Sequence, residues 1–265
     1  SCALERCLKR AMEMIDYQNK PLRQDLGDKV RGLGVALSMQ GSGIANVDIG
    51  SVEIKLQDDG FYTLAIGATD MGTGCDTILA QMAAECLDCD VDQVITQGVD
   101  TDFSPYDTGS YASATTYVTG MAVVKACETL REQIVAQAAV LLDVDPSHIC
   151  FDGTMITAAE DGKSISLKDF ANQCFAGGKG KVLIASASHV SPTSPPPFMA
   201  GIAEVDVDKL TGEIKVNDYV AVVDCGTVIN PNLARIQTEG GIAQGIGMAL
   251  FEEIGYDHNG RMQNS

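Results

Sequence analysis

The feature that most constrains the fold is a unit of two strands, a loop and a helix that occurs twice along the chain. In the first copy, two stretches of alternating apolar residues within 51–67 predict an antiparallel hairpin, and a glycine-containing loop then leads into a helix over 77–87. In the second copy, a hairpin over 202–223 precedes a loop and a helical segment over 236–251. The repetition predicts an α+β fold built from duplicated strand–strand–helix units.

Further elements are predicted from the spacing of apolar and small residues. Apolar residues within 1–20 recur at helical spacing, which predicts an amphipathic helix that needs a partner surface for its apolar stripe. A short apolar run over 32–38 predicts a buried strand, and a long helix is predicted over 115–142. Gly241 and Gly245 fall on one face of the second helical segment, which predicts close helix packing there.

The chain is predicted to divide at a proline-rich segment over 191–197, because such a segment continues neither a helix nor a central strand. We therefore expect two domains. The first, over 1–190, contains the glycine-containing loop and the long helix, and the second, over 191–265, contains the second strand–strand–helix unit in truncated form.

The charge of the chain argues against several classes of partner. Its 36 acidic and 18 basic residues give a net charge of −18, which repels nucleic-acid backbones and anionic lipid surfaces. Its longest apolar runs, of roughly ten residues, are too short to span a bilayer. We therefore expect neither nucleic-acid nor membrane partners.

The cysteines indicate a reducing compartment. Nine cysteines, an odd number, in a chain of this size are typical of reduced thiols and predict a cytoplasmic protein. Cys86 and Cys89 have the CxxC spacing of a redox pair or of half a metal site. The alternative is two small apolar residues at a helix end, which the lack of a second CxxC in the sequence favours.

The strongest local signal is the segment 71–77, which contains two glycines and lies between a strand and a helix. Glycines let backbone amides approach a ligand closely, and a helix N-terminus adds unpaired N–H groups with a partial positive charge. Thr73 and Thr77 add hydroxyl donors, so the segment is predicted to bind an anion, with phosphate favoured. The alternative is a tight turn in which Asp76 caps the helix.

A second surface of this kind precedes the long helix. The segment 107–116 is crowded with small and hydroxylated residues, which suits a polyanion, whereas the alternative is an N-cap made by Thr115 or Thr116. Two such surfaces in an acidic chain suggest one phosphorylated cofactor held mainly by neutral donors. The sequence contains no nucleophile elbow, evident triad or carboxylate cluster suited to a metal, so it indicates no self-sufficient active site.

Five segments in a fixed order together resemble the molybdenum-cofactor-binding region of the xanthine dehydrogenase/aldehyde oxidase family. The matching segments are 70–74 with Thr77 and Gln81, 112–115, 203–212, 224–231 and 237–247. In that family a pterin-dithiolene cofactor lies between glycine-rich and hydroxyl-rich loops. The resemblance therefore implies that this cofactor is the phosphorylated ligand. It also implies that the domain over 1–190 is the molybdopterin-binding subdomain.

The resemblance implies two sets of site residues. The cofactor would be contacted by Gly72, Thr73, Gly74, Thr77, Ala112, Ser113, Thr115 and Gln237. The substrate pocket would be lined by Leu37, Ser38 and Tyr111. Purine hydroxylases of the family carry an aromatic residue at the position of Leu37 and a small residue at that of Tyr111. These departures argue against a purine and leave another N-heterocycle or an aldehyde as substrate.

By this resemblance the chain is part of a molybdenum hydroxylase, an oxidoreductase that hydroxylates an N-heterocycle or aldehyde using water. Its cofactor would be molybdenum–molybdopterin in the cytosine dinucleotide form. Its partners would be the rest of the molybdenum subunit and the subunits or domains that carry iron–sulfur clusters and FAD. The family's catalytic glutamate would lie beyond Ser265, so no catalytic residue and no metal ligand is assigned here. The alternative is a non-catalytic phosphate- or nucleotide-binding or assembly module of the same fold.

Overall fold

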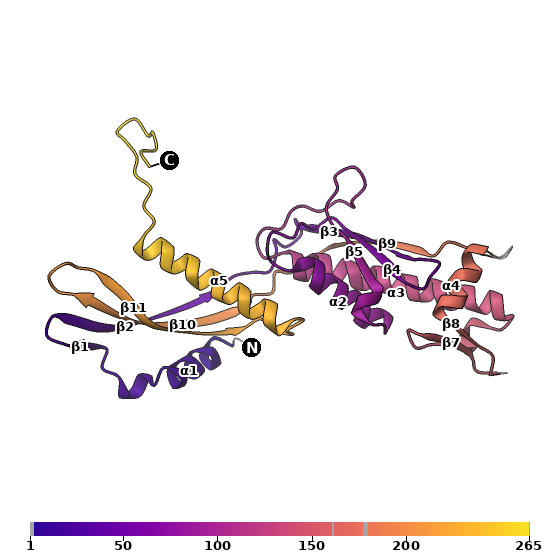
Figure 1. The fold of residues 1–265 in the computed structure, drawn as a ribbon, viewed down its shortest axis with the longest axis horizontal. Helices are drawn as coiled ribbons and strands as arrows, with labels where there is room; N and C mark the ends of the chain where they lie inside the picture. The colour runs from indigo at the N-terminus through magenta and orange to yellow at the C-terminus, as the bar shows by residue number, and fades with distance from the viewer. Residues whose placement is uncertain (1–2, 161, 177–179, 265) are drawn as a thin grey trace. The chain divides into compact units, whose positions relative to one another are not determined.

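A computed structural model of the chain describes residues 3–160, 162–176 and 180–264. Contacts divide the chain into two compact units, which are drawn in Figure 1 and described separately below. Unit 1 comprises residues 1–40 and 196–265, and unit 2 comprises residues 41–195. Among the described residues, no helix combines the length and the hydropathy that a membrane crossing requires.

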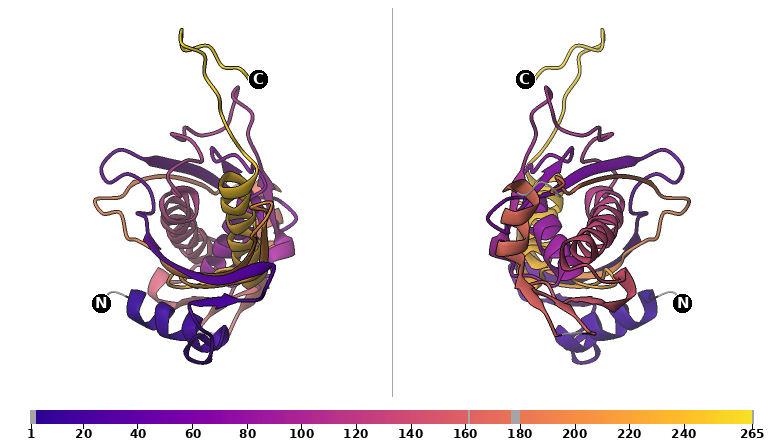
Figure 2. Two further views of the ribbon diagram at one scale, coloured as in Figure 1. Left: turned by 90° about the vertical axis from the view of Figure 1, so that its left-hand side faces the viewer. Right: turned by 90° about the vertical axis from the view of Figure 1, so that its right-hand side faces the viewer.

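Unit 1 is a four-stranded antiparallel sheet with helices on both sides. The strands lie in the order β1 (Arg23–Asp25), β2 (Lys29–Met39), β10 (Phe198–Asp208) and β11 (Ile214–Asp224). The helices are α1 (Leu4–Met14), the short 3-10 helix Tyr17–Asn19 that follows it, and α5 (Pro231–Leu250). Figures 1 and 2 show α1 and α5 on opposite sides of this sheet.

Helix α1 covers one face of the sheet with the apolar stripe that its spacing predicts. Cys7, Ala11 and Ile15 are buried against Ala200 and Ile202 of β10. Removing apolar area from water, at about 25 cal/mol per Å², holds the helix on the sheet. The predicted amphipathic helix and its need for a partner surface are confirmed, although the α-helix itself ends at Met14.

The run predicted as a buried strand is a strand, but much of it is exposed. β2 is exposed from Gly34 to Met39, and Leu37 is 48% exposed. Helix α1 packs mainly on β10 and β11, so it leaves this end of β2 uncovered within unit 1. The prediction of burial is wrong because an apolar run predicts a strand but does not show which element, if any, packs on it.

A network of ion pairs crosses the sheet of unit 1. The guanidinium of Arg31 on β2 donates to both carboxylate oxygens of Asp206 on β10, at 2.7 and 3.0 Å. Glu204, two residues earlier on the same strand, is 7% exposed and receives the ammonium of Lys20 at 2.8 Å. The hydrogen bonds from Arg31 lower the pKa of Asp206 to about 2.

This network predicts a specific dependence of stability on pH. Because the pKa of Asp206 is depressed in the folded chain, its ionised form stabilises the fold above the ordinary aspartate pKa of 3.8, and this contribution is lost as the pH falls toward about 2. We expect Asp206→Asn to weaken the decrease of Tm between pH 4 and pH 2, measured by differential scanning calorimetry. Equal slopes for Asp206→Asn and the wild type would contradict the prediction.

Unit 2 is built on a second four-stranded sheet. Its strands lie in the order β5 (Val94–Gln97), β4 (Tyr62–Ile66), β3 (Ile49–Leu56) and β9 (Ile184–Val190). Only β4 and β5 pair in parallel among these neighbours. Helix α3 (Thr115–Leu142) packs on β3 and β9, and α2 (Cys75–Leu87) packs on α3 and β5.

A smaller substructure follows α3 in unit 2. It contains the antiparallel strands β6 (Ile149–Phe151), β7 (Met155–Ala158) and β8 (Ser164–Ser166) and helix α4 (Leu167–Ala176). Two short 3-10 helices, Val91–Gln93 and Pro146–His148, precede β5 and β6. The substructure extends unit 2 beyond the four-stranded sheet.

The predicted α+β fold and its duplicated unit are confirmed. The first copy is β3, β4, a loop and α2, and the second is β10, β11, a loop and α5. Helix α3 has the predicted bounds, whereas α2 and α5 begin earlier than predicted, at Cys75 and Pro231. Asn230 explains the early start of α5, because its side chain accepts from the amide of Leu233 at 3.1 Å and proline is favoured at the first helical position.

The compact units group the chain differently from the predicted linear division into 1–190 and 191–265. The proline-rich segment does contain a passage between units, which lies between Pro195 and Pro196. However, residues 1–40 belong with the C-terminal part, because β2 pairs with β10 along the whole length of both strands. The assignment of cofactor binding to the first domain stays a prediction.

Candidate functional site

Two loops of unit 2 meet where they enter helices. Loop A (residues 67–74) joins β4 to α2, and loop B (residues 98–114) joins β5 to α3. The hydroxyl of Ser110 in loop B donates to the carbonyl of Thr69 in loop A at 2.9 Å and accepts from the amide of Thr69 at 3.3 Å. The two predicted anion-binding segments therefore belong to neighbouring loops that Ser110 joins.

The junction also depends on Gly67 having no side chain. A Cβ atom on Gly67 would lie 2.2 Å from the carbonyl oxygen of Pro105 and 2.8 Å from Cβ of Asp107, both in loop B. Both distances are well below van der Waals contact, so a larger residue would push the loops apart. The close contact between loops A and B therefore requires glycine at position 67.

Asp70 fills the interior of loop A. Its Oδ1 atom accepts hydrogen bonds from the amides of Gly72 at 2.9 Å and Gly74 at 3.1 Å. Slight burial raises the pKa of Asp70, but the amides of the loop outweigh it and hold this pKa below the usual value. The alternative in which Asp76 caps α2 is not observed, because Gly74 is the N-cap residue and the carboxylate that accepts from the amides at this helix start is that of Asp70. The glycine amides that were predicted to bind phosphate therefore already bind the carboxylate of Asp70.

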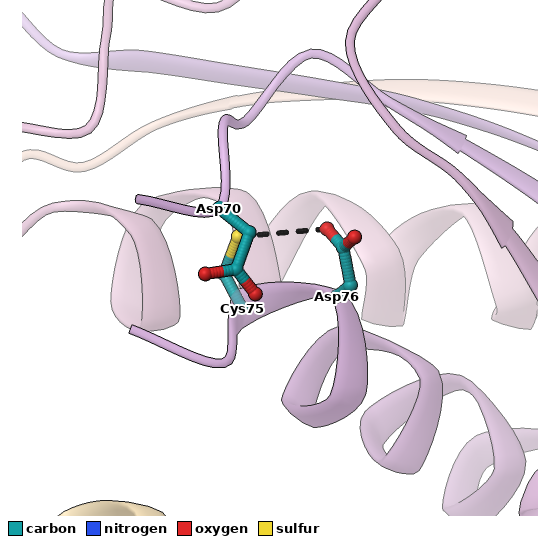
Figure 3. A group of neighbouring side chains, drawn as sticks. All are labelled: Asp70, Cys75 and Asp76. Atoms are coloured by element: carbon teal, nitrogen blue, oxygen red, sulfur yellow. Dashed lines mark hydrogen bonds between the residues drawn. The ribbon is translucent and has the colours of Figure 1, made fainter. Parts of the chain in front are cut away.

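Three potential metal ligands lie at the start of α2. Figure 3 shows Asp70, Cys75 and Asp76, whose ligand atoms lie within 4.8 Å of one another. The thiol of Cys75 donates to Asp76 at 3.7 Å, and burial raises its pKa to about 12, with the charges of Asp70 and Asp76 adding to the effect. Without a metal the Cys75 thiol is therefore protonated, and the group offers two carboxylates. No other metal-binding group is found in the part of the chain that the structure describes.

Loop B enters α3 in an unusual backbone conformation. Ala112 and Ser113 have φ angles of 49° and 58°, in the left-handed region that non-glycine residues rarely adopt. The N-cap residue is Ala114 and no side chain caps the helix, so the predicted alternative of a cap by Thr115 or Thr116 is wrong. The N-terminus of α3, with the nearby hydroxyls of Ser113 and Thr115, therefore fits a phosphate group.

Asp107 anchors loop B to the body of α3. Its Oδ1 atom accepts from the amide of Gly109 at 2.8 Å, and its Oδ2 atom accepts from the hydroxyl of buried Thr119 at 3.0 Å. A second anchor runs from the amide of Gly43 to the carbonyl of Ala112 at 2.7 Å. These contacts hold the strained turn in front of the helix.

Tyr111, a predicted pocket residue, lies at the tip of this turn. Its side chain is 43% exposed, and the approach of its phenol to the carboxylate of Asp48 raises the pKa of Tyr111. Asp48 is 1% exposed, and its Oδ2 atom accepts from the amide of Ile44 at 2.7 Å. No sequence motif points to Asp48, because its approach to Tyr111 joins residues far apart along the chain.

The remaining predicted site residues belong to unit 1. Leu37 and Ser38 are consecutive on β2, so their side chains point to opposite faces of the sheet. That both line the substrate pocket stays a prediction. Gln237 is exposed on α5.

The predicted close packing at Gly241 and Gly245 is not found within the described residues. A Cβ atom at either position would meet no atom within 4 Å. None of the residues of α5 is buried, although many are apolar. The glycine face of α5 therefore lacks a close neighbour in the described chain.

The CxxC pair shows no sign of redox activation. Burial raises the pKa of Cys86, and it raises the pKa of Cys89 to about 11. Reactive thiols and metal ligands require the opposite shift, since the thiolate is the active form. The structure therefore favours two small residues at the end of α2 and not a redox or metal site.

Comparison with known proteins defines the class to which this fold and site belong. A family model described as the molybdopterin cofactor-binding domain matches residues 10–265. The chain belongs to this family.

Individual relatives are similar to this chain over nearly its whole length. It is 37% identical over 260 residues to "Probable hypoxanthine oxidase XdhD" of Escherichia coli K12, covering 98% of this chain and 27% of that protein. It is 30% identical to the nicotine 6-hydroxylase large subunit of Paenarthrobacter nicotinovorans, covering 96% of this chain and 34% of that protein. The crystal structure of quinoline 2-oxidoreductase from Pseudomonas putida 86 superposes with a TM-score of 0.85 at 27% identity, over 98% of this chain and 35% of that one. The chain thus spans about a quarter to a third of these relatives.

Proposed function

We propose that this chain is the cofactor-binding part of a molybdenum-dependent hydroxylase. The observation that carries the proposal is the N-terminus of α3, which no side chain caps and which two consecutive left-handed residues, Ala112 and Ser113, precede. A helix N-terminus of this kind offers N–H groups and a partial positive charge to a phosphate. Molybdopterin, the ligand for which the family is described, carries such a group.

The residues of this chain would bind and orient the cofactor. Ser113 and Thr115 would hold its phosphate end at α3, and Thr77 and loop A would lie along it. We expect Gln237 to contact the cofactor through its side-chain amide. When bound, the cofactor supplies the redox chemistry by which oxygen from water reaches the substrate. We expect the cytosine dinucleotide form. We assign no catalytic residue to this chain, and the family's catalytic glutamate would be supplied by polypeptide outside it.

An N-heterocycle is the favoured substrate class. The names of two relatives refer to nicotine and quinoline, which are N-heterocycles but not purines, and the name of a third refers to hypoxanthine, which is a purine. Leu37, in place of the family's aromatic residue, and Tyr111, in place of a small one, argue against a purine. An aldehyde remains the second substrate class.

The proposed partners follow from the share of each relative that the chain matches. This chain covers 34% of a protein named as a large subunit, so we propose that the rest of a molybdenum subunit accompanies it. Subunits or domains with iron–sulfur clusters and FAD would carry electrons away from the cofactor. Free cysteines, eight of them among the described residues, favour a cytoplasmic location.

The proposal predicts how the cofactor distributes between the intact complex and the isolated chain. The complex should contain molybdenum and extractable pterin, measured by inductively coupled plasma mass spectrometry and pterin fluorescence. The 265-residue chain produced alone should fold but retain no cofactor. It would lose three or four charge-assisted hydrogen bonds of about 1.5–3 kcal/mol each, which weakens binding by several orders of magnitude. An active complex that lacks both molybdenum and pterin would contradict the proposal.

The same complex distinguishes the second candidate, a non-catalytic phosphate- or nucleotide-binding or assembly module of this fold. The observations that favour this candidate are two departures from the family pattern, Thr73 where the family more often has glutamine and Tyr111 where it has a small residue. Bound cofactor or nucleotide without reduction of an artificial electron acceptor, in the presence of N-heterocycles or aldehydes, would support it. Turnover of an N-heterocycle would exclude it.

A further inference from the structure

The glycine amides of loop A already bind a carboxylate. Oδ1 of Asp70 lies 2.9 Å from the amide nitrogen of Gly72 and 3.1 Å from that of Gly74. Gly72 and Gly74 have φ angles of 100° and 76°, so both residues use the conformational freedom of glycine to turn these amides inward. The donors that a phosphate would need are therefore directed at the chain's own anion.

The same turn directs acceptor groups outward. In a trans peptide unit the N–H of one residue and the C=O of the preceding residue point in opposite directions. The carbonyl groups of Met71 and Thr73 therefore point away from Asp70. Loop A presents backbone acceptors to a ligand where the sequence predicted donors.

The charge around loop A supports this assignment. Residues 56–124 contain eleven aspartates and glutamates and no lysine or arginine. Asp76 adds a second carboxylate beside Asp70, and the protonated thiol of Cys75 adds no positive charge. A phosphate placed in loop A would meet two carboxylates and no cation from this stretch of chain.

We propose that Asp70 is a positioning residue, which fills the amide nest of loop A with a built-in carboxylate and closes it to phosphate. Loop A then receives hydrogen-bond donors of the cofactor through its outward carbonyls, and the phosphate is left to the N-terminus of α3. The part of the proposal that concerns the cofactor rests on the proposed function. The closure of loop A to phosphate does not.

Amide NMR of the isotope-labelled full chain tests the closure, with inorganic pyrophosphate as the probe. Pyrophosphate should leave the amide resonances of Gly72 and Gly74 in place and move those at the N-terminus of α3. Movement of the Gly72 and Gly74 resonances in the wild-type chain would overturn the proposal. Pyrophosphate is added in large excess, because the chain alone is expected to bind weakly. If the Gly72 and Gly74 resonances then stay in place, loop A is closed as proposed. If those at the N-terminus of α3 also stay in place under this excess, the proposed function loses its phosphate site, so the two failures are distinguishable.

Substitutions at Asp70 test whether its carboxylate is the group responsible. In Asp70→Ala the amide protons of Gly72 and Gly74 should shift upfield by several tenths of a part per million, because their acceptor is lost. Asp70→Asn keeps an acceptor oxygen at the same place and should largely preserve both resonances, which guards against misfolding of the alanine variant. Asp76→Asn is the matched control and should leave them unchanged. Unchanged Gly72 and Gly74 resonances in a folded Asp70→Ala chain would overturn the proposal.

Discussion

Replacement of Gly50 by alanine is expected to lower the free energy of unfolding of unit 2 by about 3 kcal/mol. A Cβ atom at this position of β3 would lie 2.6 Å from both Cα and Oγ1 of Thr119 and 2.8 Å from its backbone nitrogen. Backbone atoms of a packed helix cannot rotate away as a flexible side chain can, so α3 must move off the sheet. Because Thr119 also donates to Asp107 at 3.0 Å, the movement strains the anchor of loop B as well.

Urea unfolding followed by far-UV circular dichroism measures this effect. Gly34→Ala is the matched control, since Gly34 also lies within a strand but a Cβ atom there would meet no atom within 4 Å. The control should change the free energy of unfolding by less than about 1 kcal/mol, because alanine in a strand interior is more favourable than glycine by only roughly 0.5–1 kcal/mol. If Gly50→Ala is no less stable than Gly34→Ala, α3 does not pack against β3 as closely as described.

The elements that the sequence predicted well are those set by local periodicity. The bounds of α3 agree with the prediction at both ends, and each hairpin of the duplicated unit lies where apolar alternation placed it. Both predictions rest on residues that are close together in the sequence. Each element buries one side, and this burial produces the regular spacing of its apolar residues. The early start of α5 was also encoded locally, by the Asn230–Pro231 pair, whose residues favour an N-cap and the first helical position.

The burial of β2 could not be predicted in the same way. Its apolar run identifies a strand, but the cover depends on where α1 and β10 pack, and they come from opposite ends of the chain. Which segments make up unit 1 could not be predicted for the same reason, because the pairing of β2 with β10 joins residues far apart in the sequence. Local patterns do not report such pairings.

The candidate site was found in outline but not in its internal contacts. The glycine and hydroxyl segments were identified correctly as loops at helix N-termini, and the structure adds that the two loops are neighbours. The bond between Ser110 and Thr69 joins residues from different loops, so no motif records it. The role of Asp70 was accessible in principle, since aspartate two residues before a glycine is typical of a side chain that accepts from the following amides. A pattern of glycines predicts that a loop binds an anion, but it does not show whether that anion is a ligand or a carboxylate of the chain itself.

Replacement of Gly67 by alanine is expected to remove most of the cofactor from the intact complex while leaving the fold in place. The added Cβ atom would lie 2.2 Å from the carbonyl oxygen of Pro105, so loops A and B must separate to accommodate it. That separation breaks the contacts of Ser110 with Thr69, at 2.9 and 3.3 Å, and moves the two sets of predicted cofactor residues apart. Loss of one such hydrogen bond, at about 1–1.5 kcal/mol, already lowers affinity roughly tenfold.

The measurement is the molybdenum and pterin content per chain in the purified complex, with the thermal unfolding of each variant determined in parallel. Gly98→Ala is the matched control, because Gly98 begins loop B but the nearest atom to its added Cβ would be Oδ2 of Asp76 at 3.8 Å, an ordinary contact. The control should keep the cofactor, and Gly67→Ala should hold much less molybdenum and pterin per chain than the control. Because both glycines lie in loops that border the same site, a general effect of loop substitution would lower cofactor content in both. Full cofactor content in Gly67→Ala would show that the contact between loops A and B does not position the cofactor.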